Sequence, residues 1–385
     1  MANNNENKIL NVPHLRFPEF SGEWKHVHLK EIAEFQKQRI STALLNNNNY
    51  ISTENILQDF EGIQCSSSMP ANVNVIKYQN EDILLSNIRP YLKKVWFADR
   101  KGGCSADVLV LRGNKCDKYF LYYVIASDRF INYVMSGIKG VKMPRGDKNQ
   151  MEEYAFSIPT NMEQKRIAKF ISILDERIRL QNKIIEDLKK LKSAIIDKLY
   201  SSTNGETYSF RQLFEVVNEK NKARAYKNVL SASQELGMIE RSDINIDIKF
   251  EQESISGYKI VRKGDYVVHL RSFQGGFAFS DRTGICSPAY IILRPNDLVV
   301  YSYLSHYFTS KPFIKSLKLV TYGIRDGRSI NVDEWLDMPI LLPPAQEQIR
   351  ILTIVNAIDA KLHNEVKVQF CLSSQKSYLL NTMFI

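Results

Sequence analysis

Residues 159–199 read PTNMEQKRIAKFISILDERIRLQNKIIEDLKKLKSAIIDKL, and residues 343–383 read PPAQEQIRILTIVNAIDAKLHNEVKVQFCLSSQKSYLLNTM. The second stretch lies 184 residues after the first, and the two align without a gap. The Glu-Gln pair at 163–164 then falls on the same pair at 347–348. A match of this length indicates that the chain consists of two copies of one unit.

Apolar residues recur in both stretches at steps of four and three, the spacing that lines one face of a helix. No Pro or Gly interrupts either run after its opening prolines, so each predicts one helix of about 40 residues, or about 60 Å. The simplest partner for one helix is the other; the alternative is two separate helices, each packed on its own globular domain. The residues expected to pair the helices are Ile167, Ile171, Leu174, Ile178, Ile185, Leu188, Ile195, Leu199, Ile351, Val355, Ile358, Leu362, Leu372 and Leu379.

Each apolar seam turns polar at equivalent places. Gln181 corresponds to Glu365, and Lys192 corresponds to Lys376. Polar residues in such a seam lower stability but fix the register and the partner.

The segments before the two helices also repeat, with different loop lengths. LKEIAEF at 29–35 matches FRQLFEV at 210–216, and CSADVLVLR at 104–112 matches CSPAYIILR at 286–294. Runs rich in β-branched residues, such as DILLSNI and DYVVHLR, predict strands, and the aromatic segments 119–135 and 301–317 predict helices. The sequence therefore predicts an α+β fold of two similar globular domains separated by a pair of long helices, a pseudo-two-fold repeat. The expected boundaries are 1–158 and 203–342 for the globular domains, and 159–202 and 343–385 for the helices.

The composition points to a polyanionic partner. The chain has 385 residues, a formal net charge of +10 and a pI near 9.1, a balance that favours nucleic acid. No apolar run approaches the ~18 residues that span a bilayer, and the start MANNNENKIL lacks the apolar segment of a secretory signal. The five cysteines form no C-x-x-C pair. We therefore expect a cytoplasmic protein without disulfides or a zinc site.

Signatures of catalysis are missing from the sequence. It contains no G-x-x-x-x-G-K-[ST] phosphate loop, no G-x-G-x-x-G fingerprint, no H-E-x-x-H and no G-x-S-x-G. The six histidines are scattered, so we expect no metal site. Asp82 and Asp265 occupy equivalent positions before a strand, where a turn or cap is a commoner role than catalysis. The chain is therefore expected to catalyse no reaction and to bind no cofactor itself.

Basic residues follow the predicted strands and aromatic helices in both copies. The loops GIKGVKMPRGDKNQ and YGIRDGRSI both contain Gly-Ile followed by a basic residue, beginning at Gly137 and Gly323. Small residues let the backbone approach a phosphate, and arginine can read guanine by a bidentate contact. The residues expected to contact DNA are Lys37, Arg39, Arg89, Lys93, Lys94, Lys139, Lys142, Arg145, Lys148, Lys220, Lys222, Arg224, Arg271, Arg325 and Arg328.

The whole chain resembles the specificity (S) subunits of Type I restriction-modification systems. The opening VPHLRFPEFSGEW at 12–24 is similar to the start of that family, and the stretches IP-x₃-EQ-x-RI and LP-x₃-EQ-x-RI are similar to its central and C-terminal conserved regions. The resemblance implies that two target-recognition domains each read one half of a gapped, asymmetric DNA site. It also implies that the two helices pair antiparallel and set the gap.

The resemblance further implies partner subunits that carry the chemistry. Two modification subunits would dock on the helices and methylate adenine with S-adenosylmethionine, and restriction subunits would add an ATP- and Mg-dependent nuclease. The recognition domains vary widely within the family, so the DNA contacts named above rest on this sequence alone. Two alternatives stay open: a nuclease that reads DNA with the same fold, and a coiled-coil scaffold that acts without modification subunits.

Overall fold

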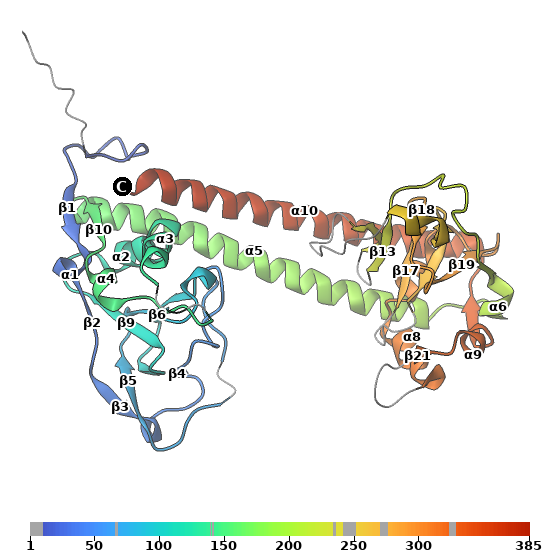
Figure 1. Ribbon diagram of the computed structural model, residues 1–385, viewed down its shortest axis with the longest axis horizontal. Coiled ribbons are helices and arrows are strands. Elements are labelled where there is room, and N and C mark those ends of the chain that lie inside the picture. Colours follow the sequence, from blue (N-terminus) through green and yellow to red (C-terminus); the bar gives the residue numbers. More distant parts are fainter. Residues whose placement is uncertain are drawn as a thin grey trace, which may run out of the picture. The chain divides into compact units, whose positions relative to one another are not determined.

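The computed structural model describes residues 11–65, 68–138, 140, 142–233, 236–241, 252–269, 276–322 and 329–385. The chain forms two compact units. Unit 1 consists of Met1–Gln181 and Val368–Ile385, and unit 2 consists of Asn182–Lys367. Each unit therefore combines one globular domain with a portion of both long helices, α5 (Asn161–Ser201) and α10 (Ala345–Met383) (Figure 1).

A four-stranded antiparallel sheet, in the order β2-β9-β6-β7, lies at the centre of unit 1. All four residues of β6 are buried, because side chains alternate across the sheet and both of its faces are covered. Ile83 and Leu85 belong to the core formed with α2 and α3, whereas Leu84 packs with Tyr78 and Trp96 on the other face. The strands of this sheet are β2 (Ala33–Phe35), β9 (Val108–Gly113), β6 (Ile83–Ser86) and β7 (Val95–Phe97).

Two further sheets and several short helices complete unit 1. A second four-stranded sheet has the order β3-β5-β8-β4, and β1 pairs with β10. The remaining strands are β1 (Lys25–His28), β3 (Arg39–Ser41), β4 (Tyr50–Ile51), β5 (Asn74–Tyr78), β8 (Gly102–Cys104) and β10 (Ala155–Ile158). The helices are α1 (Leu29–Ile32), α2 (Lys118–Ile125), α3 (Asp128–Ser136) and α4 (Lys148–Glu152), with 3₁₀ turns η1 (Thr42–Leu44) and η2 (Pro90–Leu92).

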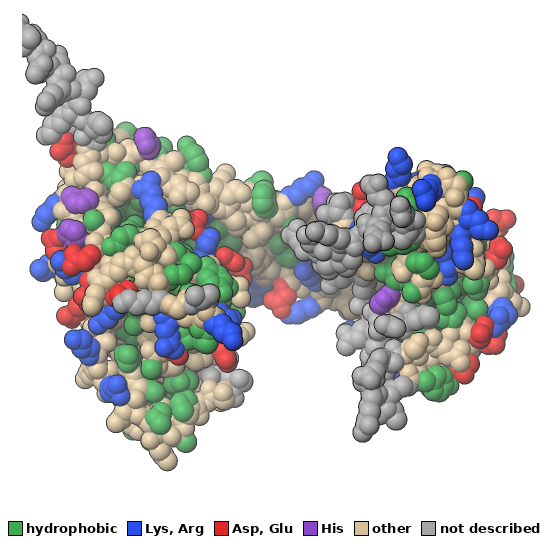
Figure 2. Space-filling view, in the orientation of Figure 1, with side chains coloured by type: hydrophobic (Ala, Val, Ile, Leu, Met, Phe, Trp, Pro, Cys, Tyr) green, Lys and Arg blue, Asp and Glu red, His purple; other side chains and the backbone are tan. Residues whose placement is uncertain are grey.

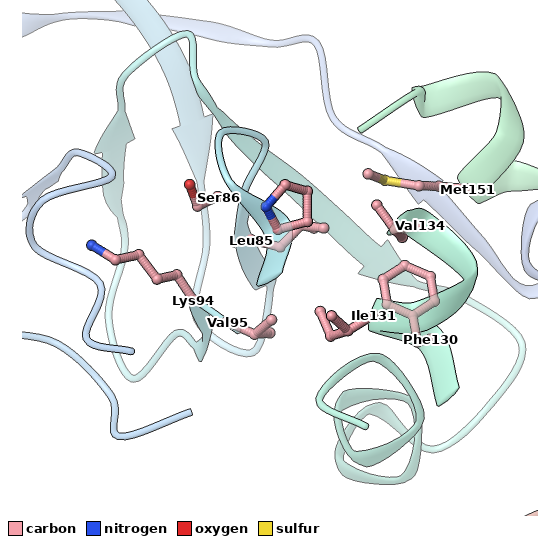
Figure 3. Close-up of a pocket in the computed structure, with 9 residues that line it drawn as sticks. Leu85, Ser86, Lys94, Val95, Phe130, Ile131, Val134 and Met151 are labelled. Carbon is pink, nitrogen blue, oxygen red and sulfur yellow. The ribbon is translucent and has the colours of Figure 1, made fainter. Parts of the chain in front are cut away.

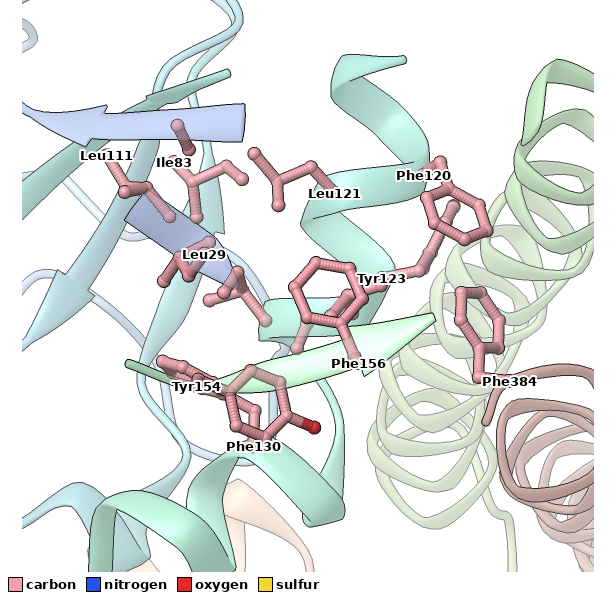
Figure 4. Packing of buried hydrophobic residues seen from close by; sticks show 14 of the residues in the cluster. Leu29, Ile83, Leu111, Phe120, Leu121, Tyr123, Phe130, Tyr154, Phe156 and Phe384 are labelled. Carbon is pink, nitrogen blue, oxygen red and sulfur yellow. The ribbon is translucent and has the colours of Figure 1, made fainter. Parts of the chain in front are cut away.

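The end of α10 packs into the core of unit 1 (Figure 4). The rings of Phe120 and Phe384 stack with their centroids 5.1 Å apart, and both are buried. The backbone N–H of Ser157 in β10 donates to a main-chain oxygen of Ile385 at 3.1 Å. Burial of a large aromatic side chain contributes about 1.5–3 kcal/mol, so Phe384 fastens the last turn of α10 to this globular domain.

Unit 2 repeats this architecture with different loops. Its central antiparallel sheet has the order β12-β19-β16-β17, which matches β2-β9-β6-β7 strand for strand. The pair β11-β22 likewise matches β1-β10. The predictions of an α+β fold and of an internal repeat are therefore confirmed. The strands are β11 (Glu206–Ser209), β12 (Phe214–Val217), β13 (Leu230–Ser233), β14 (Gly237–Glu240), β15 (Lys259–Val261), β16 (Tyr266–Val268), β17 (Phe277–Phe279), β18 (Gly284–Cys286), β19 (Ile291–Pro295), β20 (Thr321–Tyr322), β21 (Ser329–Ile330) and β22 (Pro339–Leu342). The helices are α6 (Phe210–Leu213), α7 (Tyr303–Tyr307), α8 (Lys311–Ser316) and α9 (Val332–Leu336), with 3₁₀ turns η4 (Gln252–Gly257) and η5 (Leu317–Val320).

The aromatic segments do not form the single helices that their periodicity predicts. Segment 119–135 is divided between α2 and α3, and segment 301–317 between α7 and α8. Ser127 Oγ accepts the N–H of Phe130, and Ser310 Oγ accepts the N–H of Phe313. Each serine thus caps the start of a second helix, a role that serine fulfils better than it continues a helix.

The two long helices pair antiparallel in each unit. Near the start of α5, Ile167 and Ile171 share a core with Met383 at the end of α10. Near the end of α5, Ile196 shares a core with Ile351 at the start of α10. These clusters also include residues of the globular domains, so helix pairing and packing on the globular domain occur together. None of the described helices combines the length and the apolarity needed to cross a bilayer.

Candidate DNA interface and its helical support

Each lysine of the helix seam forms an ion pair. In unit 2, Lys192 Nζ lies 2.5 Å from a carboxylate oxygen of Asp359; in unit 1, Lys376 Nζ lies 2.5 Å from Asp175. Asp175 corresponds to Asp359 in the repeat, and Lys192 corresponds to Lys376. The aspartate of each copy therefore meets the lysine of the other. A parallel, in-register pair would oppose like charges at both places, so these residues favour the antiparallel arrangement.

One side chain of an aromatic helix lies near each ion pair. In unit 1, the Tyr123 hydroxyl donates to Asp175 at 2.8 Å. His306 takes the equivalent place in unit 2, beside Lys192 and Asp359. Burial, followed by the nearby Lys192 charge, lowers the pKa of His306 below its ordinary value. The imidazole is therefore held neutral beside the ion pair.

The glutamine of each Glu-Gln motif ties the first turn of a long helix to its globular domain. Gln164 donates from Nε2 to the carbonyl of Pro159 and accepts from the N–H of Asp117, both at 2.8 Å. Gln348 donates to the carbonyls of Leu298 and Pro343, at 2.9 Å each. Gln348 also accepts the N–H of Val300 at 2.8 Å. Both glutamines are almost fully buried, which explains why an amide, with donors and an acceptor, occupies this position twice.

The glutamate of the motif differs between the units. Glu163 is fully buried, and Arg16 makes a bidentate contact with it at 2.7 and 2.8 Å. Glu347 is partly exposed and pairs with Arg350 on its own helix. Only four residues separate α5 from β11, whereas a longer segment that contains Arg16 precedes β1. The first helix start is therefore covered by the N-terminal segment, a contact that no sequence pattern predicted.

The equivalent aspartates Asp82 and Asp265 brace the central sheets. Asp82 receives two hydrogen bonds from Arg112 at 2.7 Å, and Asp265 receives two from Arg294 at 2.9 Å. Each also accepts a backbone N–H three residues earlier in the turn before the strand. The expected turn role is confirmed, with an arginine partner that the sequence did not predict. The equivalent Cys104 and Cys286 are buried, and burial raises the pKa of each thiol to about 12, so both thiols are neutral at neutral pH.

The basic candidates of unit 1 fall into two groups. Four of them contact other groups of the protein. Lys93 pairs with Asp128 at 2.8 Å, and Arg145 pairs with Asp107 at 3.0 Å. Lys94 donates to the carbonyl of Thr53 at 2.8 Å. Lys148 lies over the ring of Phe35 and 4.0 Å from Glu152. Lys37, Arg39, Arg89 and Lys142 are exposed and make no ion pair with a described residue. The second group is therefore the better placed to meet a phosphate or a base.

The basic candidates of unit 2 that the structure describes lie on one ordered loop. Lys220, Lys222 and Arg224 are exposed and follow β12, as Lys37 and Arg39 follow β2 in unit 1. Asn221 belongs to this loop, and its side chain is buried. It donates to the carbonyl of Tyr226 at 2.8 Å and accepts the N–H of Tyr226 at 3.2 Å. The loop thus presents three cations on a fixed backbone.

Four further candidates lie outside the described residues: Lys139, Arg271, Arg325 and Arg328. On the face drawn in Figure 2, Lys and Arg side chains are visible on both globular domains, with Asp and Glu between them. Charge alone therefore does not outline one basic patch on this face, and loop position is the more informative criterion.

The residues expected to pair the helices share one property in the structure. Every one of them is buried or half-buried. Ile167, Ile171, Ile351, Val355 and Leu372 are the buried members. Sequence reasoning missed Ile196, which directly follows a seam position and is buried against the second globular domain.

Comparison with known protein families gives two matches in this chain. Residues 21–190 and 205–369 each match the family described as the Type I restriction modification DNA specificity domain. Each matched region contains one globular domain and much of the long helix that follows it.

Two relatives and one solved structure illustrate the similarity. The chain is 29% identical over 208 residues to the Type I restriction enzyme MjaVIII specificity subunit of Methanocaldococcus jannaschii, covering 51% of this chain but only 46% of that protein. It is 23% identical over 310 residues to the putative MjaX specificity subunit of the same organism, covering 72% of this chain and 70% of that protein. A chain in a solved Type I restriction-modification system, described for its complex assembly and conformational transition, has the same fold. It shares 17% identity with a TM-score of 0.59, over 96% of this chain and 98% of that chain.

Proposed function

The chain belongs to the family of Type I restriction-modification DNA specificity domains, and from this premise we propose that it is the specificity subunit of such a system. It reads DNA and catalyses no reaction itself. The observation that carries the proposal is the repeat: two globular domains share one central sheet order and end in helices that pair through exchanged Asp–Lys contacts. Such a chain offers two equivalent places for two portions of one DNA site.

The two globular domains differ in the loops that carry their exposed cations. The segment after β2 carries Lys37 and Arg39, whereas the segment after β12 carries three cations around Asn221. The two loops follow equivalent strands but differ in length and charge, so they would read different bases. Base contacts come from individual side chains. We therefore propose a bipartite site whose halves differ in sequence.

The long helices provide surfaces for partner subunits. On α5, Ile173 and Leu180 in unit 1 are 49% and 45% exposed, and Ile184 and Leu191 in unit 2 are 45% and 51% exposed. Exposed apolar residues at helical spacing are typical of protein–protein contact. We propose that one modification subunit docks on the helices in each unit, and that restriction subunits join the full complex in the cytoplasm. S-adenosylmethionine, ATP and Mg would act in these partners, and this chain would hold none of them.

Salt-dependent binding of duplex DNA tests the proposal. With the purified chain and its modification subunits, the logarithm of the binding constant should fall linearly with the logarithm of salt concentration. Replacing Lys220, Lys222 and Arg224 by alanine should weaken binding and reduce the slope by about 1 for each lost phosphate contact. Lys189→Ala, on the exposed side of α5, is the control for one charge lost outside this loop. Absence of duplex binding by the assembled complex would contradict the proposal.

A further inference from the structure

The connection between β6 and β7 contains a turn of unusual backbone geometry. Arg89 has φ = 50° and Lys93 has φ = 52°, and these two left-handed residues flank the 3₁₀ turn η2. Residues other than glycine adopt this conformation rarely, and strained positions of this kind concentrate at functional sites. The turn of residues 89–93 is called the Arg89–Lys93 turn below.

The surroundings hold this turn from several sides. Pro90 is buried and lines a small pocket with Phe130, Val134 and Met151 (Figure 3). The N–H of Arg89 donates to the carbonyl of Pro144 at 2.8 Å. In addition, the N–H groups of Asp59 and Phe60 donate to the carbonyls of Leu92 and Lys93, at 3.1 Å each. The strained backbone is therefore fixed before any ligand binds, which reduces the ordering cost of binding.

The side chains of the turn divide into paired and unpaired groups. Lys93 pairs with Asp128 at 2.8 Å, and Lys94, which follows the turn, donates to the carbonyl of Thr53 at 2.8 Å. Arg89 is exposed and has no ion-pair partner among the described residues. Tyr91, a large aromatic residue at the middle of the turn, is 48% exposed. The two residues turned to solvent are thus one arginine and one tyrosine.

A second loop adds positive charge beside the turn. Ile88 and Arg145 form a backbone bridge, and Pro144 accepts the bond from Arg89 described above. This loop also carries Lys142, which is exposed. The cations near the turn favour an anionic polymer over a neutral or basic partner.

From this geometry, and resting on the function proposed above, we infer that the Arg89–Lys93 turn is a base-reading element of the first globular domain. Arg89 contacts a base edge in the major groove, where guanine offers two acceptors to one guanidinium. The hydroxyl of Tyr91 bonds a neighbouring phosphate and fixes the register. Lys93 and Lys94 hold the turn and contact no base.

Selection from a duplex library with a randomised centre tests this inference with the full chain and its modification subunits. The unmodified chain should select a gapped sequence with two defined halves. Arg89→Ala should lose the preference for one base pair in one half only, with about 10-fold or greater loss of affinity for the selected duplex. Tyr91→Phe should weaken binding to all selected sequences alike, since a phosphate contact carries no sequence information.

A pair of glycine variants separates reading from folding. Glycine tolerates the left-handed conformation, so Arg89→Gly and Lys93→Gly relieve the same backbone strain. Only Arg89→Gly should change the selected sequence, because the Lys93 side chain faces Asp128. If Arg89→Gly selects the same sequence as the unmodified chain, the inference is overturned while the proposed function stands. If the unmodified complex selects no sequence, the proposed function itself fails.

Discussion

Lys192 Nζ lies 2.5 Å from the Asp359 carboxylate, and the pair related to it by the repeat, Lys376 and Asp175, is separated by the same 2.5 Å. The side chains of Lys192 and Asp359 are 25% and 35% exposed, so water only partly screens their charges. Ion pairs of this kind contribute modestly to stability, yet a wrong alignment of the helices would oppose like charges. The two pairs therefore act mainly on the direction and register in which the helices meet.

Exchanging the charges of one pair should show this coupling. Lys192→Asp places a second acid beside Asp359, and we expect it to lower the free energy of unfolding by about 1 kcal/mol or more. Adding Asp359→Lys should recover much of the loss, with a coupling energy of about 0.5–1 kcal/mol in urea unfolding. Lys190→Glu, which disrupts an exposed pair with Glu186 on α5, is the control and should cost less than about 0.5 kcal/mol. Equal destabilisation by the single and double variants would contradict the role assigned to the pair.

Alanine substitution should lower stability far more at the buried glutamines than at their exposed neighbours. Gln348→Ala leaves the N–H of Val300 and the carbonyls of Leu298 and Pro343 without their partner. A group that loses its partner and is shielded from water costs about 1–3 kcal/mol. We expect a clear fall in thermal stability, measured by calorimetry. Gln346→Ala, two residues earlier on the exposed side of α10, should change the free energy of unfolding by less than about 0.5 kcal/mol. Similar stability of the two variants would show that Gln348 does not fasten the helix.

The stability of unit 2 should depend on pH through His306. The folded protein holds this imidazole neutral and lowers its pKa below 6.5, so the unfolded chain binds more protons. The contribution of the neutral His306 to the free energy of unfolding is therefore complete above about pH 6.5. It is lost as the pH falls from there through the lowered pKa. His306→Tyr, which copies Tyr123 of unit 1, should flatten the dependence below about pH 6.5 in urea unfolding. His363→Tyr, at an exposed site on α10, is the control for loss of a histidine. The same pH dependence of unfolding in the two variants would argue against the role of His306.

Replacing a buried aspartate should lower the free energy of unfolding more than replacing an exposed aspartate that also pairs with an arginine. Asp265 is 2% exposed, and Asp265→Asn removes the charge that Arg294 contacts twice. We expect a loss of about 2–3 kcal/mol in the free energy of unfolding, because the guanidinium keeps only a weaker acceptor. Asp281→Asn, in an exposed pair with Arg282, should cost no more than about 1 kcal/mol. If Asp265→Asn leaves the free energy of unfolding unchanged, contacts other than this ion pair stabilise the sheet.

The sequence predicted what its periodicity and repeats encode. The seam at Ile167, Ile171 and Leu372 follows a local pattern, and strand β6 is recognisable from its run of apolar residues. The ion pair between Asp175 of one copy and Lys376 of the other could not be predicted from a local pattern, because it depends on the direction in which the helices pair. The same holds for Arg16 and Glu163, which lie 147 residues apart in the chain.

The sequence could not show which of the candidate DNA contacts pair with other groups of the protein. Lys93 and Arg89 lie four residues apart in one loop, yet Lys93 is held by an ion pair with Asp128 while Arg89 stays exposed. A basic residue in a loop gives no sign of such a pairing until its tertiary partner is known. The serine caps that divide the aromatic helices were visible as Ser127 and Ser310, but the apolar periodicity around them outweighed the cap signal.

The methylation pattern of DNA in cells that express this chain with its modification subunits tests the central claim most directly. We expect methylated adenines within one gapped, asymmetric motif that disappears when this chain is deleted. Replacing residues 25–158 by the corresponding segment of a relative should change one half of that motif and leave the other half intact. A methylation pattern that does not change when this chain is deleted, or a motif without a gap, would show that this chain does not act as the specificity subunit.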